Sequence, residues 1–303
     1  MSTPKTTRQW VVKDTKNGFD AASLNYRDLI IPKGQYPFPT ATPVVPCSDG
    51  AGKVVAVGPK VSEFKEGDVV ATLFNQKHQA GPVKPAGIAS GLGGALDGAL
   101  REYGVFPETG LVRAPSNTTA NEASTLVCGT GGVSLAAIQF ARAAGANVIA
   151  TSSSEEKLEF LKKLGANHVI NYKTDQNWGE TAKKLTTGGL GVDHVIEVGG
   201  PGTMKQSMLA IKLEGTITVI GFLGGATAEN TPSTLDALTH LCTVRGIIVG
   251  SRQQFEDMVR AIEASDIHPV VDKKVFPFEK AVDAYQYQWD QKHVGKVVIE
   301  VGT

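Results

Sequence analysis

The sequence predicts an α/β protein in which a doubly wound parallel sheet accompanies a second, β-rich domain. Three observations lead to this prediction. Between about residues 125 and 250, short β-branched runs alternate with amphipathic helical patterns. A glycine turn at Gly129–Ser134 passes directly into a helical pattern. Up to about residue 115, by contrast, short β-rich runs are densely punctuated by Gly and Pro. Because parallel strands need crossover helices between them, the alternation favours a parallel sheet.

Composition places the chain among ordinary globular proteins. Its 303 residues are 41% hydrophobic and 20% charged, which is enough for two domains. Thirty basic and thirty acidic residues cancel, so nothing indicates a nucleic-acid or membrane-surface partner. The first ten residues lack the apolar core of a signal peptide, and no apolar run is long enough to span a bilayer. We therefore expect a cytoplasmic protein.

The β-rich domain is expected at 1–115, together with the tail 269–303. The tail returns to a strand, helix and strand pattern, which we expect to pack on the first part. Gly87–Gly98 consists almost entirely of Gly, Ala, Ser and Leu, which is typical of a mobile surface loop. The short β-rich runs in the first part are Lys53–Val57, Asp68–Leu73 and Val105–Val112.

Six strands, with helices between most of them, are expected in the second domain, 116–268. One helix spans Glu155–Leu164, with Ser153 and Glu156 at capping-box spacing and Gly165 at its end. The expected strands are Thr125–Cys128, Asn147–Thr151, His168–Tyr172, His194–Val198, Thr216–Gly221 and Val244–Val249.

The glycine turn is the clearest functional signal. Its first glycine permits a tight turn from strand to helix, and its second lets backbone N–H groups approach a pyrophosphate closely. The helix N-terminus that follows then favours the negative charge. We therefore expect a dinucleotide held at Gly129, Thr130, Gly131, Gly132 and Val133.

The end of the second strand indicates which dinucleotide binds. An NAD site places Asp or Glu there, to bind the ribose 2′-hydroxyl. Here the strand ends in Ser152 and Ser153, whose hydroxyls can donate to a 2′-phosphate, and Lys157 lies one helical turn further on. The sequence therefore predicts NADP(H).

Eight landmarks in the expected order resemble the medium-chain dehydrogenase/reductases, specifically the zinc-independent, quinone-oxidoreductase-like and enoyl-reductase-domain branch. This resemblance covers nearly the whole chain. It implies a GroES-like catalytic domain, a Rossmann domain and a cofactor cleft between them. The landmarks are Ala22–Asp28, Cys47–Gly58, Phe64–Val70, Gly98–Tyr103, the glycine turn, Lys163–Ala166, Val219–Gly221 and His293–Val298.

The resemblance also implies further cofactor contacts and the absence of a metal. Zinc-dependent relatives use a Cys and a His-Glu pair where this chain has Asn25 and Ser48-Asp49. Zinc prefers thiolate, imidazole and carboxylate ligands, so we expect no metal. The implied cofactor contacts are Tyr172, Val198, Gly199, Gly221, Phe222, Leu223, Gly295 and Lys296.

The expected activity is an NADPH-dependent, metal-free transfer of hydride to a quinone, enone, aldehyde or ketone. Asn25 and Tyr26 are the candidate catalytic residues, and Tyr36 is a further phenol nearby. We expect Arg27 and Asp28 to form a local ion pair. Two alternatives stay open: a trans-2-enoyl thioester reductase, and a protein that binds the cofactor but is catalytically impaired. The protein can also form a homodimer on this interpretation.

Two departures from the family favour the impaired form. Relative to the family, the chain lacks one segment near 18–22 and another near 124–129. The second gap removes most of the region that should hold the first strand of the Rossmann sheet. Either Thr125–Cys128 takes that place as a four-residue strand, or the central position of the sheet stays empty. An empty position would leave two unpaired strand edges, so we expect the four-residue strand. We interpret the chain as a shortened form of a longer reductase.

Overall fold

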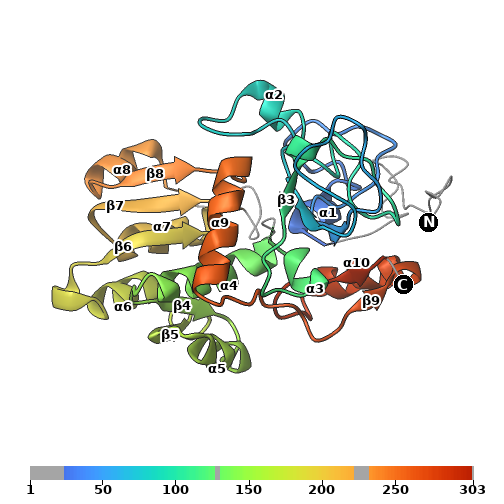
Figure 1. Cartoon of the computed structure of the whole chain (residues 1–303). Coiled ribbons are helices and arrows are strands. Elements are labelled where there is room, and N and C mark those ends of the chain that lie inside the picture. The colour runs from blue at the N-terminus through green and yellow to red at the C-terminus, as the bar shows by residue number, and fades with distance from the viewer. Residues whose placement is uncertain (1–23, 127–129, 222–231, 302–303) are drawn as a thin grey trace. The chain divides into compact units, whose positions relative to one another are not determined.

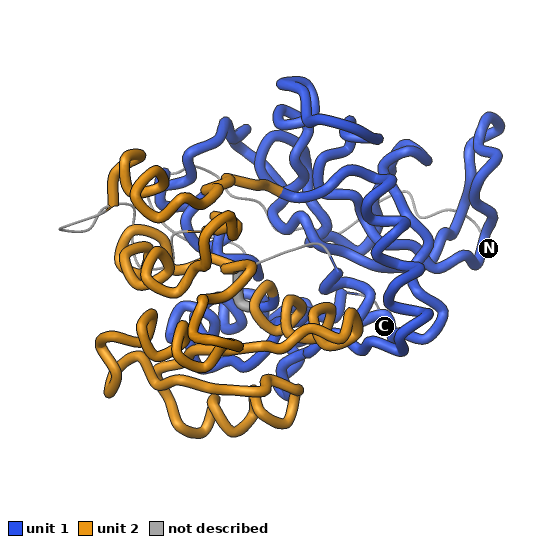
Figure 2. The backbone as a smooth tube through the Cα atoms, turned by 90° about the vertical axis from the view of Figure 1, so that its left-hand side faces the viewer, with its two compact units in different colours: residues 1–132, 249–303 blue, residues 133–248 orange. Residues whose placement is uncertain are grey.

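The computed structural model describes residues 24–126, 130–221 and 232–301. The chain forms two compact units, which Figure 2 shows in different colours. Unit 1 comprises 1–132 and 249–303, and unit 2 comprises 133–248. No helix in the described part of the chain is long and apolar enough to cross a membrane.

Unit 1 is built on a small antiparallel sheet, as the β-rich runs predict. Its strands pair in the order β1-β2-β3. The middle strand lies inside the expected Asp68–Leu73, but Lys53–Val57 is a strand only at Lys53 and Val105–Val112 only at its last two residues. In the middle strand, Val70 and Ala71 are buried. The elements of this unit are α1 (Tyr26–Ile30), β1 (Ala51–Lys53), β2 (Val69–Thr72), α2 (Pro85–Ile88), η1 (Glu108–Gly110), β3 (Leu111–Arg113), α3 (Ala120–Ala123), α9 (Arg252–Ala264), β9 (Phe276–Pro277), η3 (Phe278–Lys280), α10 (Ala281–Trp289) and β10 (Ile299–Glu300).

The C-terminal tail packs on the first part of unit 1, which confirms the expectation. Tyr285 of α10 is 1% exposed and lies in one hydrophobic cluster with Leu29, Val45 and Leu100. Strands β9 and β10 pair in parallel, which closes the tail on itself. Residues far apart in sequence therefore share one core, and this fixes α1 against the C-terminal segment.

The glycine-rich segment 87–98 is mostly buried, so the prediction of a mobile surface loop is wrong. A Cβ on Gly98 would lie 2.0 Å from the carbonyl oxygen of Cys47, and one on Gly93 would lie 2.7 Å from the Cys47 backbone. Glycines are common both in flexible loops and where two backbones pack closely, and here they do the second. Composition alone does not distinguish a flexible loop from a closely packed one.

Unit 2 holds five of the six expected parallel strands, and Figure 1 shows them with their helices. Strand β4 pairs in parallel with β5, and β7 lies between β6 and β8. Helix α4 begins in unit 1 and continues through this unit. The elements are α4 (Thr130–Ala143), β4 (Ile149–Ser152), α5 (Glu155–Leu164), β5 (His168–Asn171), α6 (Trp178–Lys184), η2 (Thr187–Gly189), β6 (Val192–Glu197), α7 (Pro201–Ala210), β7 (Ile211–Val219), α8 (Thr234–Thr239) and β8 (Thr243–Gly246).

The expected first strand at Thr125–Cys128 is not a strand where the structure describes it. Thr119 and Glu122 form a capping box that starts α3. The amide of Thr125 then donates to the Glu122 carbonyl at 2.9 Å, so Thr125 and Leu126 continue the helical turn. The rest of the segment lies outside the described residues. Within those residues, β4–β5 and β6–β7–β8 are therefore two separate sheets.

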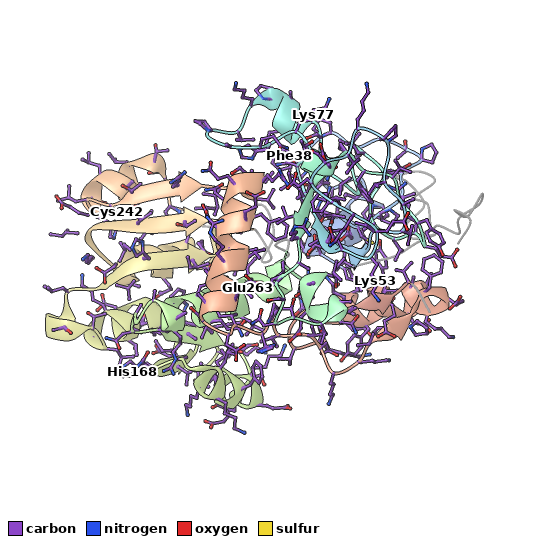
Figure 3. The ribbon with its side chains drawn as sticks, in the orientation of Figure 1. Phe38, Lys53, Lys77, His168, Cys242 and Glu263 are labelled. Atoms are coloured by element: carbon purple, nitrogen blue, oxygen red, sulfur yellow. The ribbon has the colours of Figure 1, made fainter. Side chains whose placement is uncertain are left out.

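Helix α5 has the predicted bounds, and its end is the predicted one. Gly165 caps it with φ of 115°, a conformation that favours glycine. Its start differs from the prediction, because the N-cap is Ser154, which makes no side-chain capping bond, and not Ser153. His168 opens β5 and is exposed, as Figure 3 shows.

Candidate functional site

Four polar side chains of unit 1 form a connected group, which we call the lysine cluster: Asn25, Ser48, Asp49 and Lys296. The Lys296 ammonium donates to Asn25 Oδ1 at 2.5 Å and to Asp49 Oδ2 at 2.9 Å. Ser48 receives a hydrogen bond from Asn25 Nδ2 at 3.2 Å and donates to Asp49 Oδ1 at 2.6 Å. Lys296 and Asp49 side chains are each only 8% exposed, so the charges face each other with little water between them.

Local structure holds each member of the lysine cluster in place. Asn25 precedes α1, and its backbone amide donates to Asp28 Oδ2 at 2.7 Å. At the end of β2, the Thr72 hydroxyl donates to the Ser48 carbonyl at 2.8 Å. Lys296 follows Gly295, where φ is 90° and a Cβ would lie 2.4 Å from the carbonyl oxygen of Val270. Only glycine fits before this lysine.

Asp28 lies beneath the cluster as a fully buried carboxyl group. Burial raises its pKa to about 7, although the charge of Arg27, the amide of Asn25 and the charge of Lys296 each act to lower it. The charge of Asp49 raises it further. Its Oδ1 atom has no hydrogen-bond partner among the described residues. Near neutral pH this group is therefore close to half protonated.

Arg27 does not pair with Asp28, so the predicted local ion pair is wrong. Its Nη1 atom donates instead to the Leu92 carbonyl at 2.7 Å. The guanidinium carbon lies over the rings of Tyr36 and Phe74, at 4.9 and 4.6 Å from their centroids. The Asp28 carboxylate accepts a hydrogen bond from the Asn25 amide at the start of its own helix, and Arg27 acts on it only through its charge.

Tyr26 and Asn25, the two predicted catalytic residues, have different surroundings. Asn25 is 3% exposed and binds the ammonium of Lys296. Tyr26 is partly buried and packs against the hydrophobic cluster that contains Leu29 and Tyr285. Asn25 is thus the one of the two that the structure shows within the lysine cluster.

The predicted phosphate turn is described only in part. Gly129 lies outside the described residues, and Thr130 and Gly131 open helix α4. A Cβ on Gly132 would lie 2.9 Å from Cγ of Lys296, so the stem of this lysine packs against the glycine. Val133 follows in the helix. Two predicted cofactor residues that are distant in sequence, Gly132 and Lys296, are therefore neighbours.

In unit 2 the predicted 2′-phosphate residues gather at the ends of β4 and β5. The amide of Tyr172 donates to the Ser152 carbonyl at 3.1 Å, which places these residues side by side. Ser153 follows Ser152, and Lys157 lies half-exposed in the first turn of α5. An acid that the sequence reasoning overlooked, Glu155, accepts a hydrogen bond from the side chain of Asn171, the last residue of β5.

Glu197 is a second acid at a strand end that the sequence analysis did not single out. It ends β6 with a carboxylate 3% exposed, which accepts from the amides of Gly199 and Gly200 at 2.8 and 2.9 Å. The Ser207 hydroxyl also donates to it. This carboxylate shapes the predicted Val198-Gly199 turn. An acid at a strand end before Gly-Gly-Pro was the signal available.

Of the three cofactor residues predicted at 221–223, the structure describes only Gly221. Gly221 is buried just beyond the strand. Phe222 and Leu223 lie outside the described residues. The carboxyl ends of β4, β5, β6 and β7 therefore carry the predicted contacts of unit 2, and such ends are where open α/β sheets bind nucleotides.

The lysine cluster does not fit a zinc ion. Its members offer an amide, a hydroxyl and one carboxylate, whereas zinc sites use thiolate, imidazole and carboxylate ligands. An ammonium already occupies the position between Asn25 and Asp49, and it would repel a divalent cation. Within the described ranges there is no group of three His, Cys, Asp or Glu residues suited to hold a metal.

Comparison with known proteins gives the family. Two family models match, "Alcohol dehydrogenase GroES-like domain" over residues 18–116 and "Zinc-binding dehydrogenase" over 132–264. A zinc-type alcohol dehydrogenase-like protein of Schizosaccharomyces pombe is 48% identical, over 93% of this chain and 89% of that protein. A chloroplast envelope quinone oxidoreductase homolog of Arabidopsis thaliana is 29% identical, over 93% and 88%.

A solved structure agrees with the sequence comparisons. The crystal structure of a putative alcohol dehydrogenase from Sinorhizobium meliloti has a TM-score of 0.86 and 34% identity, and the match covers 99% of this chain and 100% of that one. Along this chain the match to the GroES-like model comes first and the match to the zinc-binding dehydrogenase model follows. This chain belongs to the medium-chain dehydrogenase/reductase family of NAD(P)H-dependent oxidoreductases.

Proposed function

We propose that this protein is an NADPH-dependent reductase of quinones, enones, aldehydes or ketones that works without a metal. The observation that carries the proposal is the buried ammonium of Lys296, held by Asn25 and Asp49. These two residues occupy the positions where zinc-dependent relatives carry ligands. The quinone oxidoreductase homolog among the relatives supports the substrate class.

The lysine cluster can stabilise the charge that develops during reduction. When bound, the reduced nicotinamide supplies a hydride to carbon, and the electron pair of the C=O bond moves to oxygen. An ammonium has three N–H donors, of which two are used within the described residues. The third can donate to that oxygen, and the low-dielectric surroundings strengthen the interaction. The proton that completes the alcohol then comes from Lys296 or from water.

The choice of NADPH is supported by the strand ends of unit 2. No acid ends β4, where Ser152 stands, and Lys157 can face a 2′-phosphate as a positive charge. Glu155 is the nearest opposing charge, and its carboxylate is engaged by Asn171. We expect a higher kcat/KM with NADPH than with NADH, measured on one substrate with both cofactors. A preference for NADH would contradict this assignment.

Replacing Lys296 by Met tests the metal-free mechanism. We expect kcat to fall about 100-fold, the usual effect of removing one group that stabilises an oxyanion. The Kd of NADPH, measured by fluorescence, should change little. Lys274→Met is the matched control, because that exposed lysine lies over the Phe276 ring in the same unit. A K296M variant with unchanged kcat and weakened NADPH binding would make Lys296 a cofactor contact only.

A second candidate, a protein that binds NADPH but turns over no carbonyl, is favoured by the separation of β4 from β6. The alignment with the S. pombe relative spans 309 positions, more than the 303 residues of this chain, which supports internal gaps. Screening quinones, enones, aldehydes and enoyl thioesters with NADPH separates the two. Quenching of tryptophan fluorescence by NADPH without turnover of any compound would favour this second function.

A further inference from the structure

Arg27 carries a positive charge that no carboxylate in the described part of the chain pairs with. Its guanidinium makes one hydrogen bond, from Nη1 to the Leu92 carbonyl. Its Nε atom is enclosed and has no hydrogen-bond partner there. Arginine normally uses its five donors in a rigid fork that matches a carboxylate. An arginine with unused N–H donors can bind a ligand that supplies acceptors.

The surroundings of Arg27 fix its position without neutralising it. Tyr36 and Phe74 present their rings to the guanidinium carbon, which gives cation–π attraction but supplies no acceptor. Gly94 makes room for the group, since a Cβ there would lie 2.5 Å from Nη2. The side chain is therefore packed in one orientation against the two rings and the Gly94 backbone.

This arginine borders the lysine cluster. It lies in the short helix α1, two residues after Asn25, which precedes that helix, and the charges of Arg27 and Lys296 both act on the Asp28 carboxyl. The glycine segment that flanks the guanidinium also packs on the Cys47 backbone, next to Ser48. A small molecule with its carbonyl at Lys296 therefore has Arg27 within the same part of unit 1.

We propose that Arg27 binds a carboxylate of the substrate, so that the preferred substrates are carbonyl or enone acids and not neutral carbonyls. The proposal rests on the reductase function given above. Asp49 balances the charge of Lys296, whereas the Asp28 carboxyl, which is only partly ionised near neutral pH, balances that of Arg27 only in part. One negative charge neutralises it, as a monoanionic carboxylate does. A carboxylate also accepts two parallel N–H bonds from the guanidinium edge, whereas a neutral carbonyl accepts fewer and weaker ones.

Matched substrates test the proposal. We compare kcat/KM for 4-carboxybenzaldehyde and for its neutral methyl ester, with NADPH. The wild-type enzyme should prefer the acid, and Arg27→Gln should lower kcat/KM for the acid about 10- to 100-fold while leaving the ester unchanged. Arg27→Lys keeps the positive charge but not the planar pair of donors. Its kcat/KM for the acid should therefore lie between those of the wild type and Arg27→Gln. The control is Arg113→Gln, because Arg113 also lies over a ring, that of Phe64, but pairs with Asp68 at 2.8 Å.

A binding measurement separates this proposal from the reductase function. Calorimetry with benzoate and with benzamide reports the subsite without turnover. Benzoate that binds the wild type and not Arg27→Gln supports the subsite, even if neither aldehyde is reduced. Equal kcat/KM for acid and ester in the wild type, or an equal loss for both in Arg27→Gln with intact folding by circular dichroism, would overturn it.

Discussion

The buried carboxyl of Asp28 should make the stability of this protein fall as pH rises through the weakly acidic range. The unfolded chain ionises this group near 3.8, whereas the folded chain holds the proton up to about 7. Between these values the folded state binds about one proton more than the unfolded state. The free energy of unfolding therefore decreases with increasing pH, and levels off above pH 7.

The size of the effect follows from the width of that window. Each unit of pKa difference corresponds to about 1.36 kcal/mol, so the contribution of Asp28 falls by about 4 kcal/mol between pH 4 and pH 7. This is a large part of the stability of an average domain, which is about 5–15 kcal/mol. The cause is burial, and the positive charges of Arg27 and Lys296 reduce it only in part.

Asp28→Asn isolates this contribution from all other titrating groups. The amide is neutral at every pH, and its oxygen can still accept the hydrogen bond from the Asn25 amide. The measurement is urea unfolding by circular dichroism at pH 4, 5, 6, 7 and 8, for the variant and the wild type. The difference in unfolding free energy between them should move by about 4 kcal/mol in favour of the variant across that range.

The control is an acid in the same unit whose pKa is shifted in the opposite direction. The pKa of Asp68 is lowered, chiefly by the hydrogen bond from the Lys65 amide, with Arg113 adding to it. Asp68→Asn should therefore lose stability relative to the wild type as pH rises, and not gain it. A pH-independent difference between Asp28→Asn and the wild type would show that Asp28 is ionised in the folded protein, and would refute the reasoning.

Two further predictions concern packing and cofactor choice. Gly98→Ala should lower the melting temperature, because its Cβ would overlap the Cys47 carbonyl oxygen and such overpacking costs about 1–3 kcal/mol. Gly52→Ala is the control and should leave the melting temperature unchanged, because nothing lies within 4 Å of the added Cβ. An unchanged melting temperature for Gly98→Ala would mean that the two backbones separate easily. Ser152→Asp should shift the ratio of kcat/KM from NADPH towards NADH, because a carboxylate repels a 2′-phosphate and binds a ribose hydroxyl; a ratio that stays the same would place the phosphate elsewhere.

Much of the architecture follows from local sequence. The bounds of helix α5 are predictable because its apolar face identifies the helix and Gly165 marks its end. Five of the parallel strands are predictable because their β-branched runs are separated by helical patterns. Thr125–Cys128 looked like a sixth, but the capping box of Thr119 and Glu122 drew its first residues into a helical turn. Local capping outweighed β propensity there.

The lysine cluster is less visible in the sequence, because its members come from distant segments. Lys296 and Asn25 are 271 residues apart, and no pattern short of the fold brings them together. Sequence reasoning identified both residues, but for separate roles, one for the cofactor and one for catalysis. The role of Arg27 was misjudged for a related reason. Adjacency to Asp28 suggested an ion pair, but in the fold Asp28 accepts from the Asn25 amide and Arg27 donates to the Leu92 carbonyl.

The two parts of the proposed function, carbonyl reduction at the lysine cluster and cofactor binding, depend on the fold to different degrees. The lysine cluster is held within unit 1 by contacts from α1, from the end of β2 and from the Gly295 turn, and each of these is complete. The nucleotide contacts depend on β4 and β6, which pair on one side only within the described residues. Unpaired strand edges hold their carboxyl ends less rigidly. We therefore expect the positioning of the bound cofactor, and not the lysine cluster itself, to limit turnover by this enzyme.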